Sequence, residues 1–411
     1  MSTFSIPLSG LQANSESLNV IANNLANLDT DGYKNETLDF ASIFAQMQGT
    51  SGNGDPIQTG NGVQVAGTVS NFSDGNVSST DIDSNMALQG NGFFVVQDAN
   101  GTDYTRNGDF TVNSQGELCT QSGQLVMGYP AVDGVVDTSA ALAPINVDQA
   151  NNIPASATTS FDMTTNLDAT ATVGSTYSSP ITVYDSLGES HDLTVTYTNT
   201  AANTWTYSIT LPAADTGGTG DSTQIASGTL TFNSSGVLTS PTGSVTGIDV
   251  TGLADGAADM SLTWNLGTSG TPAITQQSAD SATSASSQNG YASGTLTGYQ
   301  VLSDGTVQGE FSNKQTLDLG QVAVASFANN QGLVQTANNN YQASSSSGAA
   351  VLGVAGQGGD GTITGGSVEE SNVSLSTEFA NLIVAQQGYE ANAKVLTTLN
   401  QVMQSTLQML T

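Results

Sequence analysis

The last part of the chain carries a long helical pattern of apolar positions. Apolar or small residues recur there at alternating spacings of four and three, which is the a/d seam of an α-helix. The seam runs through Leu375, Phe379, Leu382, Gln386, Tyr389, Ala393, Leu396, Asn400, Met403, Leu407 and Leu410. At about 1.5 Å per residue, a helix from Ser374 to Thr411 would be roughly 57 Å long. A helix that is apolar on one side needs a partner.

The first part of the chain repeats this pattern on a shorter scale. The same spacing joins Phe4, Leu8, Leu11, Ser15, Leu18, Ala22 and Leu25. Pro7 falls in the first turn, where its missing N–H costs least. Gly32 can adopt the left-handed conformation that ends a helix. The sequence therefore predicts a helix at each end, with seams that meet within and across copies to form a coiled coil.

An ordinary antiparallel helical hairpin in a monomer is the alternative interpretation of these two seams. Against it, the chain between them is polar and strand-like, which suits it poorly to covering two long helices. Gln386 and Asn400 are also the kind of polar seam residues that fix register and oligomeric state. We expect self-assembly to depend on the apolar seam residues Leu8, Leu11, Leu18, Leu25, Leu375, Phe379, Leu382, Tyr389, Leu396, Met403, Leu407 and Leu410.

Between the two helical segments, short β-branched and aromatic runs separated by turns predict strands. The clearest runs are 63–69, 93–96, 104–106, 110–112, 181–184, 193–197, 205–209, 228–232 and 260–264. Those after residue 180 lie near a ten-residue spacing, which is typical of an antiparallel sandwich or barrel.

Composition divides this middle part of the chain. Residues 149–287 contain neither Lys nor Arg and many Thr, Ser and Gly, which predicts an inserted outer β-domain that ends in the Ser/Ala-rich segment 278–287. The other predicted regions are an inner β-domain (73–148 and 288–359), an extended connector (31–72 and 360–369) and the terminal helical domain (1–30 and 370–411). The predicted class is α+β, with terminal helices in a coiled coil and two mainly antiparallel β-domains nested by insertion.

Charge and composition exclude several classes of protein. The net charge is −31, with 35 acidic residues against four basic ones, so the chain has no basic footprint for nucleic acid. No run of eighteen apolar residues occurs, so we expect no membrane insertion. The single cysteine, Cys119, allows no internal disulfide and is expected to be a small buried residue. The chain also begins without the basic and apolar regions of a signal peptide, so we expect a non-standard export route.

Candidate chemical groups are few, and each has a plainer interpretation. His191 is the one histidine, without a Gly-x-Ser-x-Gly elbow or a P-loop, and we interpret it as a turn residue. The segments 98–103 and 358–363 resemble calcium loops but lack the EF-hand spacing or an array of repeats, so a turn and a linker are expected. We expect no catalytic residue, cofactor or metal. The many possible carboxylate pairs leave open a secreted β-rich carbohydrate-active enzyme. The composition also leaves open an adhesin.

Five groups of motifs in order make the chain resemble a known family. They are Ala22–Asn27 with Gly32–Lys34, Gly90–Val96 with Tyr104–Arg106 and Gly128–Tyr129, Val183–Gly188 with His191 and Trp205–Tyr207, Glu370–Val373, and Gln386–Lys394. Together they resemble the rod and hook axial proteins of the bacterial flagellum, over nearly the whole chain. The large insertion at 149–287 favours the hook branch over the distal rod branch, which is the alternative within the family.

This resemblance implies a structural protein rather than an enzyme. It implies a helical homopolymer, a curved and flexible tube that couples the rod to the filament for motility, with an inner layer of terminal helices. The implied partners are further copies, the distal rod protein, the hook cap and the hook–filament junction proteins. It also implies export through the flagellar type III apparatus, without a cleaved signal peptide, to the extracellular hook next to the basal body.

Overall fold

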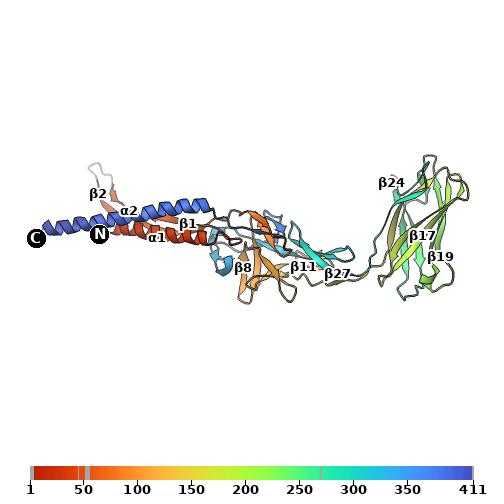
Figure 1. Cartoon of the computed structure of the whole chain (residues 1–411), viewed down its shortest axis with the longest axis horizontal. Coiled ribbons are helices and arrows are strands. Elements are labelled where there is room, and N and C mark those ends of the chain that lie inside the picture. Colours follow the sequence, from red (N-terminus) through yellow and green to blue (C-terminus); the bar gives the residue numbers. More distant parts are fainter. Residues whose placement is uncertain (1–3, 45, 51–55, 269–270, 410–411) are drawn as a thin grey trace. The chain divides into compact units, whose positions relative to one another are not determined.

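The computed structural model describes residues 4–44, 46–50, 56–268 and 271–409 (Figure 1). The chain divides into two compact units. Unit 1 comprises residues 1–149, 298–310 and 316–411, and unit 2 comprises residues 150–297 and 311–315. Unit 2 is thus inserted into unit 1, and the predicted insertion at 149–287 lies within it from residue 150 onward.

Two α-helices in unit 1 confirm the helical pattern at both ends of the sequence. They are α1 (Ser5–Ala26) and α2 (Leu375–Met409), and they lie side by side (Figure 1). Pro7 is in the first turn of α1, and Gly32 has φ +68° in the turn after it, as expected. Neither of these helices is apolar enough over its length to cross a membrane.

The predicted connector after α1 forms paired strands. β1 (Glu36–Ser42) pairs antiparallel with β4 (Val63–Ser70), and between them β2 (Gln46–Thr50) pairs with β3 (Pro56–Thr59). Asn24 of α1 fixes the start of this hairpin, because its amide donates to the Glu36 carbonyl at 2.8 Å and accepts from the Glu36 N–H at 3.0 Å. The segment is therefore a hairpin tied to α1.

The β-rich part of unit 1 is built on an antiparallel sheet with the order β28-β29-β11-β7-β8-β31-β30. Its core contains Phe93, Tyr104, Met127 and Tyr341, and Phe93 makes edge-to-face contacts with Phe72 and Phe327. The strands are β5 (Val77–Ser79), β6 (Met86–Gln89), β7 (Phe93–Asp98), β8 (Gly101–Thr105), β9 (Phe110–Val112), β10 (Leu118–Thr120), β11 (Leu125–Val132), β12 (Val135–Val136), β13 (Ala143–Pro144), β28 (Thr306–Phe311), β29 (Thr316–Ser326), β30 (Val334–Gln335), β31 (Asn340–Gln342), β32 (Val351–Val354), β33 (Thr362–Gly365) and β34 (Ser367–Glu369).

Unit 2 contains two five-stranded sheets that share one apolar core. One sheet has the order β16-β17-β18-β19-β20; the other has β21-β22-β15-β25, with β26 also on β15. Side chains alternate between buried and partly exposed along β17 and β18, and Trp264 of β22 packs on Tyr207 of β18 at 5.3 Å between ring centres. The strands are β14 (Asn152–Ile153), β15 (Ser160–Asp168), β16 (Thr176–Tyr184), β17 (Ser190–Ala201), β18 (Thr204–Pro212), β19 (Ser222–Phe232), β20 (Leu238–Ser240), β21 (Ser244–Val250), β22 (Met260–Asn265), β23 (Gly267–Thr268), β24 (Thr271–Pro272), β25 (Ile274–Gln277) and β26 (Ala282–Gln288). The next strand, β27 (Gly294–Val301), begins in unit 2 and ends in unit 1.

The pairing in unit 2 is mainly antiparallel, as predicted, and one expectation about this unit was wrong. The exception to antiparallel pairing is β15, which runs parallel to both β22 and β25 and makes this sheet mixed. The Ser/Ala-rich segment 278–287, expected as a boundary, contains most of β26, which pairs with β15. Its small polar side chains are compatible with a strand at the edge of the sheet that has one face exposed to solvent.

Candidate functional site

Small and polar residues face one another across the contact between α1 and α2. A methyl group added at Gly10 would lie 2.7 Å from Oδ1 of Asn392, and one added at Gly388 would lie 2.6 Å from Oδ1 of Asn14. The numbers of each facing pair sum to 402, so the two helices run antiparallel. The glycines let the helix backbones approach closely enough for each asparagine to cover the opposite glycine.

Each helix uses the same local bond to hold its asparagine in place. The Asn14 amide donates to the Gly10 carbonyl at 2.7 Å, and the Asn392 amide donates to the Gly388 carbonyl at 2.9 Å. Two Gly-x-x-x-Asn segments thus interlock across the helix pair. These residues are neither apolar nor charged, so the pattern of apolar positions does not indicate them.

The apolar seam predicted from the sequence lies largely outside this contact. Six of its residues are between 42% and 61% exposed: Leu8, Leu375, Phe379, Tyr389, Met403 and Leu407. Five others are partly buried: Leu11, Leu18, Leu25, Leu382 and Leu396. Leu410 lies outside the described residues. The residues of the helix pair buried within the chain are instead Pro7, Ala13, Val20, Ile21, Asn24, Glu378 and Ala385. Each described helix therefore keeps apolar surface that its own chain does not cover.

The end of α2 extends beyond α1 (Figure 1). The antiparallel register places the start of α1, Ser5, opposite Thr397. Every described residue from Gln401 to Met409 is exposed, including Val402 at 58% and Leu407 at 61%. An apolar helix end with no cover needs a partner.

A buried ionic cluster, termed here the clasp, anchors both helices to the β-rich part of unit 1. Lys34 follows α1, Glu369 precedes α2, and their Nζ and Oε1 atoms are 2.6 Å apart, with both side chains almost fully buried. Arg106, at the end of β8, lies 3.6 Å from Glu369 and 3.5 Å from Asp74. The clasp thus contains two of the four basic residues of the chain.

Hydrogen bonds complete the clasp. Lys34 also donates to the Ser73 carbonyl at 2.9 Å, and the Gly75 N–H donates to Glu369 at 2.7 Å. Burial lowers the pKa of Lys34, although the neighbouring Glu369 carboxylate opposes that shift. A buried charge of this kind is tolerated only when it is paired. The clasp therefore holds together the chain segment that leaves α1 and the segment that leads into α2.

His191 was expected in a turn, and this expectation was wrong. It is a buried residue of β17, and its ring nitrogens lie 2.9 Å from Asp215 and 3.2 Å from Asp185. Because a carboxylate only accepts hydrogen bonds, both nitrogens carry protons in this arrangement. Burial acts to lower the pKa of His191, but the bonds to Asp215 and Asp185 outweigh it, so the pKa is raised above 6.5.

A third carboxylate group lies close to His191. Asp185, His191 and Asp255 bring potential ligand atoms within 4.8 Å of one another, in the part of the chain that the structure describes. Both ring nitrogens of His191 lie within hydrogen-bond distance of a carboxylate. The imidazolium links strand β17 to Asp185, which follows β16, and to Asp215 in the short 3-10 helix Ala213–Thr216.

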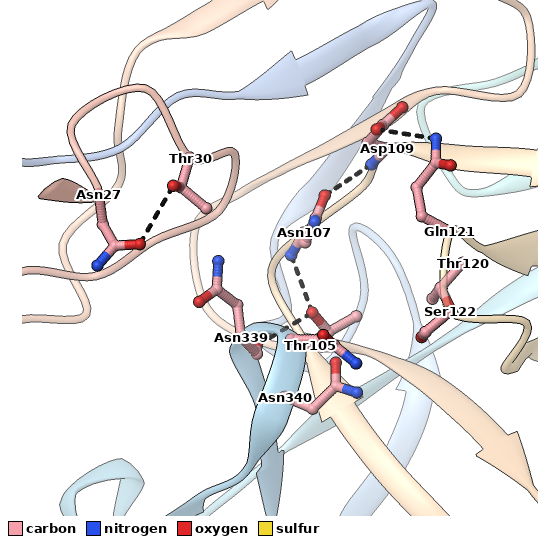
Figure 2. A pocket seen from close by; sticks show the side chains of 11 residues that line it. Asn27, Thr30, Thr105, Asn107, Asp109, Thr120, Gln121, Ser122, Asn339 and Asn340 are labelled. Carbon is pink, nitrogen blue, oxygen red and sulfur yellow. Dashed lines mark hydrogen bonds between the residues drawn. The ribbon is translucent and has the colours of Figure 1, made fainter.

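A polar pocket of about 560 Å³ lies beside the turn that follows α1 (Figure 2). Its wall is rich in amides and hydroxyls, and Asp109 is its one charged residue. Figure 2 shows these groups bonded to one another: Asn107 accepts from the Asp109 N–H at 2.9 Å, and Gln121 donates to the Asp109 carboxylate at 3.2 Å. The pocket lacks the pair of carboxylates that glycoside hydrolysis needs.

Family models match the chain in four places. They are described as "Flagella basal body rod protein" (residues 6–34), "Flagellar hook protein FlgE/F/G D1 domain" (87–167), "Flagellar basal body protein FlaE D2 domain" (146–291) and "Flagellar basal body rod FlgEFG protein C-terminal" (364–409). The matches at 6–34 and 364–409 include α1, α2 and the two clasp residues Lys34 and Glu369. The 146–291 match lies almost wholly within unit 2.

Several curated relatives match over nearly their full length. The chain is 37% identical to the flagellar hook protein FlgE of Salmonella typhimurium, over 98% of each chain. It is 35% identical to that of Escherichia coli, over 97% of this chain and 98% of the other, and 31% identical to that of Treponema pallidum, over 98% of each. The crystal structure of the Helicobacter pylori flagellar hook protein FlgE2 shares the fold, with a TM-score of 0.52 at 16% identity over 70% of this chain and 98% of the other. By its sequence along almost its whole length, the chain belongs to the bacterial flagellar hook protein family.

Proposed function

We propose that this chain is the structural subunit of the flagellar hook, and that it self-assembles into a curved, flexible tube that couples the rod to the filament. The observation that carries the proposal is the apolar surface left on both helices. Gly10, Asn14, Gly388 and Asn392 lie in the contact within the chain, while six seam residues stay at least 42% exposed and remain available to other copies.

The seams are proposed to form a coiled-coil layer between copies. The assembly residues are those predicted from the sequence, and the partly covered ones, such as Leu18 and Leu396, would be buried further in the polymer. Fully burying a Leu or Phe side chain contributes about 1.5–3 kcal/mol. A seam with many half-exposed apolar residues can therefore offset the cost of association.

A joint must bend without coming apart, and the two kinds of surface support this. The apolar helix seams would hold the polymer together. The outer surfaces of the β-rich parts are rich in hydroxyl and amide groups, whose hydrogen bonds contribute only about 0.5–1.5 kcal/mol each. One set of these hydrogen bonds between copies can replace another with little change in free energy. The outer layers can therefore adjust while the inner layer stays fixed.

The remaining parts of the proposal follow from the family. The four predicted regions, namely the terminal helices, the connector, the inner β-domain and the inserted outer domain, would be the structural layers of the subunit. The partners would be the distal rod protein, the hook cap and the hook–filament junction proteins. The route to the hook would be the flagellar type III export apparatus.

Removal of residues 375–411 tests the proposal. The full chain is expected to form curved tubes at raised concentration or salt, visible by electron microscopy, and the shortened chain none. Trp205 and Trp264 are the two tryptophans of the chain and both lie in the core of unit 2, so their fluorescence checks that this unit stays folded. Tubes that persist after the truncation would refute the assembly role of α2. A full chain that stays monomeric and hydrolyses a polysaccharide would favour the enzyme alternative, and straight tubes would favour a rod protein.

A further inference from the structure

A small pocket lies where α1, α2 and β1 meet in unit 1. It has a volume of about 260 Å³, below the roughly 300–1,000 Å³ of sites that take a drug-sized ligand. Val20, Ile21, Leu38 and Val384 contribute apolar walls, and Glu36 and Glu378 contribute two carboxylates. We call it the Glu378 pocket.

Glu378 has a carboxylate oxygen with no partner. The residue is 3% exposed, and its Oε2 atom makes no hydrogen bond to any described residue. Burial raises the pKa of Tyr33 to about 12, and the negative charges of Glu36 and Glu378 add to this rise. Burial also raises the pKa of Glu36. A buried carboxylate without a counterion is costly, so the pocket is complementary to a cation.

The apolar walls narrow the choice of cation to one with an aliphatic stem. A lysine side chain fits this description, because it buries its methylene groups along apolar surface and carries its charge at the tip. The chain offers few candidates: Lys34 and Arg106 are already used in the clasp. Lys314 and Lys394 are exposed and form no ion pair with a described residue.

Resting on the proposed function, we infer that Lys394 of a second copy enters the Glu378 pocket in the polymer. Lys394 follows Ala385 by nine positions, which is two and a half turns, so it lies on the side of α2 that faces away from α1. It cannot reach the pocket of its own chain, because sixteen residues along a helix separate it from Glu378 by about 24 Å. Lys314 lies in unit 2, outside the helical layer in which the pocket is found.

The same separation of about 24 Å sets the offset between neighbouring copies. For Lys394 to reach Glu378 of a neighbour with parallel helices, the two copies must be offset by about 24 Å along the helix axis. Every copy would then insert its Lys394 into the pocket of one neighbour and bind the Lys394 of another neighbour in its own pocket. The contact is heterologous, so it can repeat without closing and is compatible with a helical tube.

Matched neutral substitutions test the contact. Glu378→Gln and Lys394→Gln should each raise the critical concentration for polymer formation about tenfold, which corresponds to ~1.4 kcal/mol. The double variant should be no worse than the worse single variant, because the two changes remove one interaction. Lys314→Gln, which removes the other exposed lysine, is the control and should leave the critical concentration unchanged. Glu378→Gln should not weaken unit 1 of the monomer, because it removes an unpartnered charge.

Cross-linking identifies the pair directly. A carbodiimide joins an amine to a carboxylate that it touches, and polymers mixed from 15N-labelled and unlabelled chains show which links join two copies. A Lys394–Glu378 or Lys394–Glu36 link between copies supports the inference. A Lys314–Glu378 link overturns it, as does an unchanged critical concentration for Lys394→Gln in a chain that still polymerises. A chain that forms no polymer at all overturns the proposed function and this contact with it.

Discussion

Glu369 neutralises two buried cations, so replacing it with alanine should strongly destabilise unit 1. Its carboxylate lies 2.6 Å from Lys34 and 3.6 Å from Arg106. It also accepts the N–H of Gly75 at 2.7 Å. Removing one member of a buried pair costs about 3–5 kcal/mol, because the other charge is left unpaired. We expect Glu369→Ala to lower the free energy of unfolding of unit 1 by about this amount.

The positions of the two tryptophans allow the loss of stability to be assigned to one unit. Amide exchange in the core strands β7 and β29 reports the opening of unit 1. Fluorescence of Trp205 and Trp264 reports unit 2 alone, and its denaturant midpoint should not change. Glu390→Ala, which removes an exposed carboxylate from α2, is the matched control and should have an effect within about 0.5 kcal/mol.

A second variant separates lost charge pairing from lost packing. Lys34→Met combined with Glu369→Leu replaces the closest ion pair by apolar groups, and Arg106 keeps Asp74 at 3.5 Å. Buried pairs replaced in this way often lose little stability, so the double variant should be more stable than Glu369→Ala alone. A cost below about 1 kcal/mol for Glu369→Ala, or a double variant that is no better, would refute the role assigned to the clasp.

Three further predictions concern other parts of the chain. The stabilisation of unit 2 by His191 should be fully present below pH 6.5 and should be lost as the pH rises through the raised pKa of the folded state. The urea midpoint of unit 2, measured by tryptophan fluorescence, should therefore fall in that pH window, and His191→Gln should remove the fall. Leu407→Ser should raise the critical concentration for polymers without changing the stability of the monomer, whereas Gln404→Ser on the same exposed helix end should change neither. Gly388→Val should separate α1 from α2, since even a methyl group there lies 2.6 Å from Asn14, and amide exchange in α1 should become faster although valine is the better helix former; unchanged exchange would contradict the close packing.

Much of the fold could be predicted from the sequence because burial repeats along it. The alternation of β17 and β18 is visible in the sequence, since every second residue enters the core of unit 2. The helices were predicted from their apolar spacing for the same reason. The hairpin strand β1 has no such pattern, because its residues are all partly or fully exposed, and its pairing with β4 depends on contacts with α1 such as those of Asn24.

The polar parts of the candidate site could not be predicted, because their partners are far apart in the sequence. Lys34 and Glu369 are 335 residues apart, and no local pattern relates them. Gly388 and Asn14 meet only because of the antiparallel register of the helices. His191 lies next to a turn in the sequence, and only the fold brings Asp215 to its second nitrogen. Periodicity indicates which faces are buried, but not which polar groups meet there.

The wide separation of the two clasp residues has a consequence for the order of folding. All of unit 2 except residues 311–315 is one continuous stretch, so it can fold from contacts within that stretch. Lys34, by contrast, must wait for a carboxylate that is synthesised 335 residues later. Closing so long a loop is slow. Until the loop closes, Lys34, which follows α1, has no Glu369 carboxylate as its counterion. The clasp therefore serves as a check on completeness, because a chain cut short before residue 369 cannot dock its first helix in the native way.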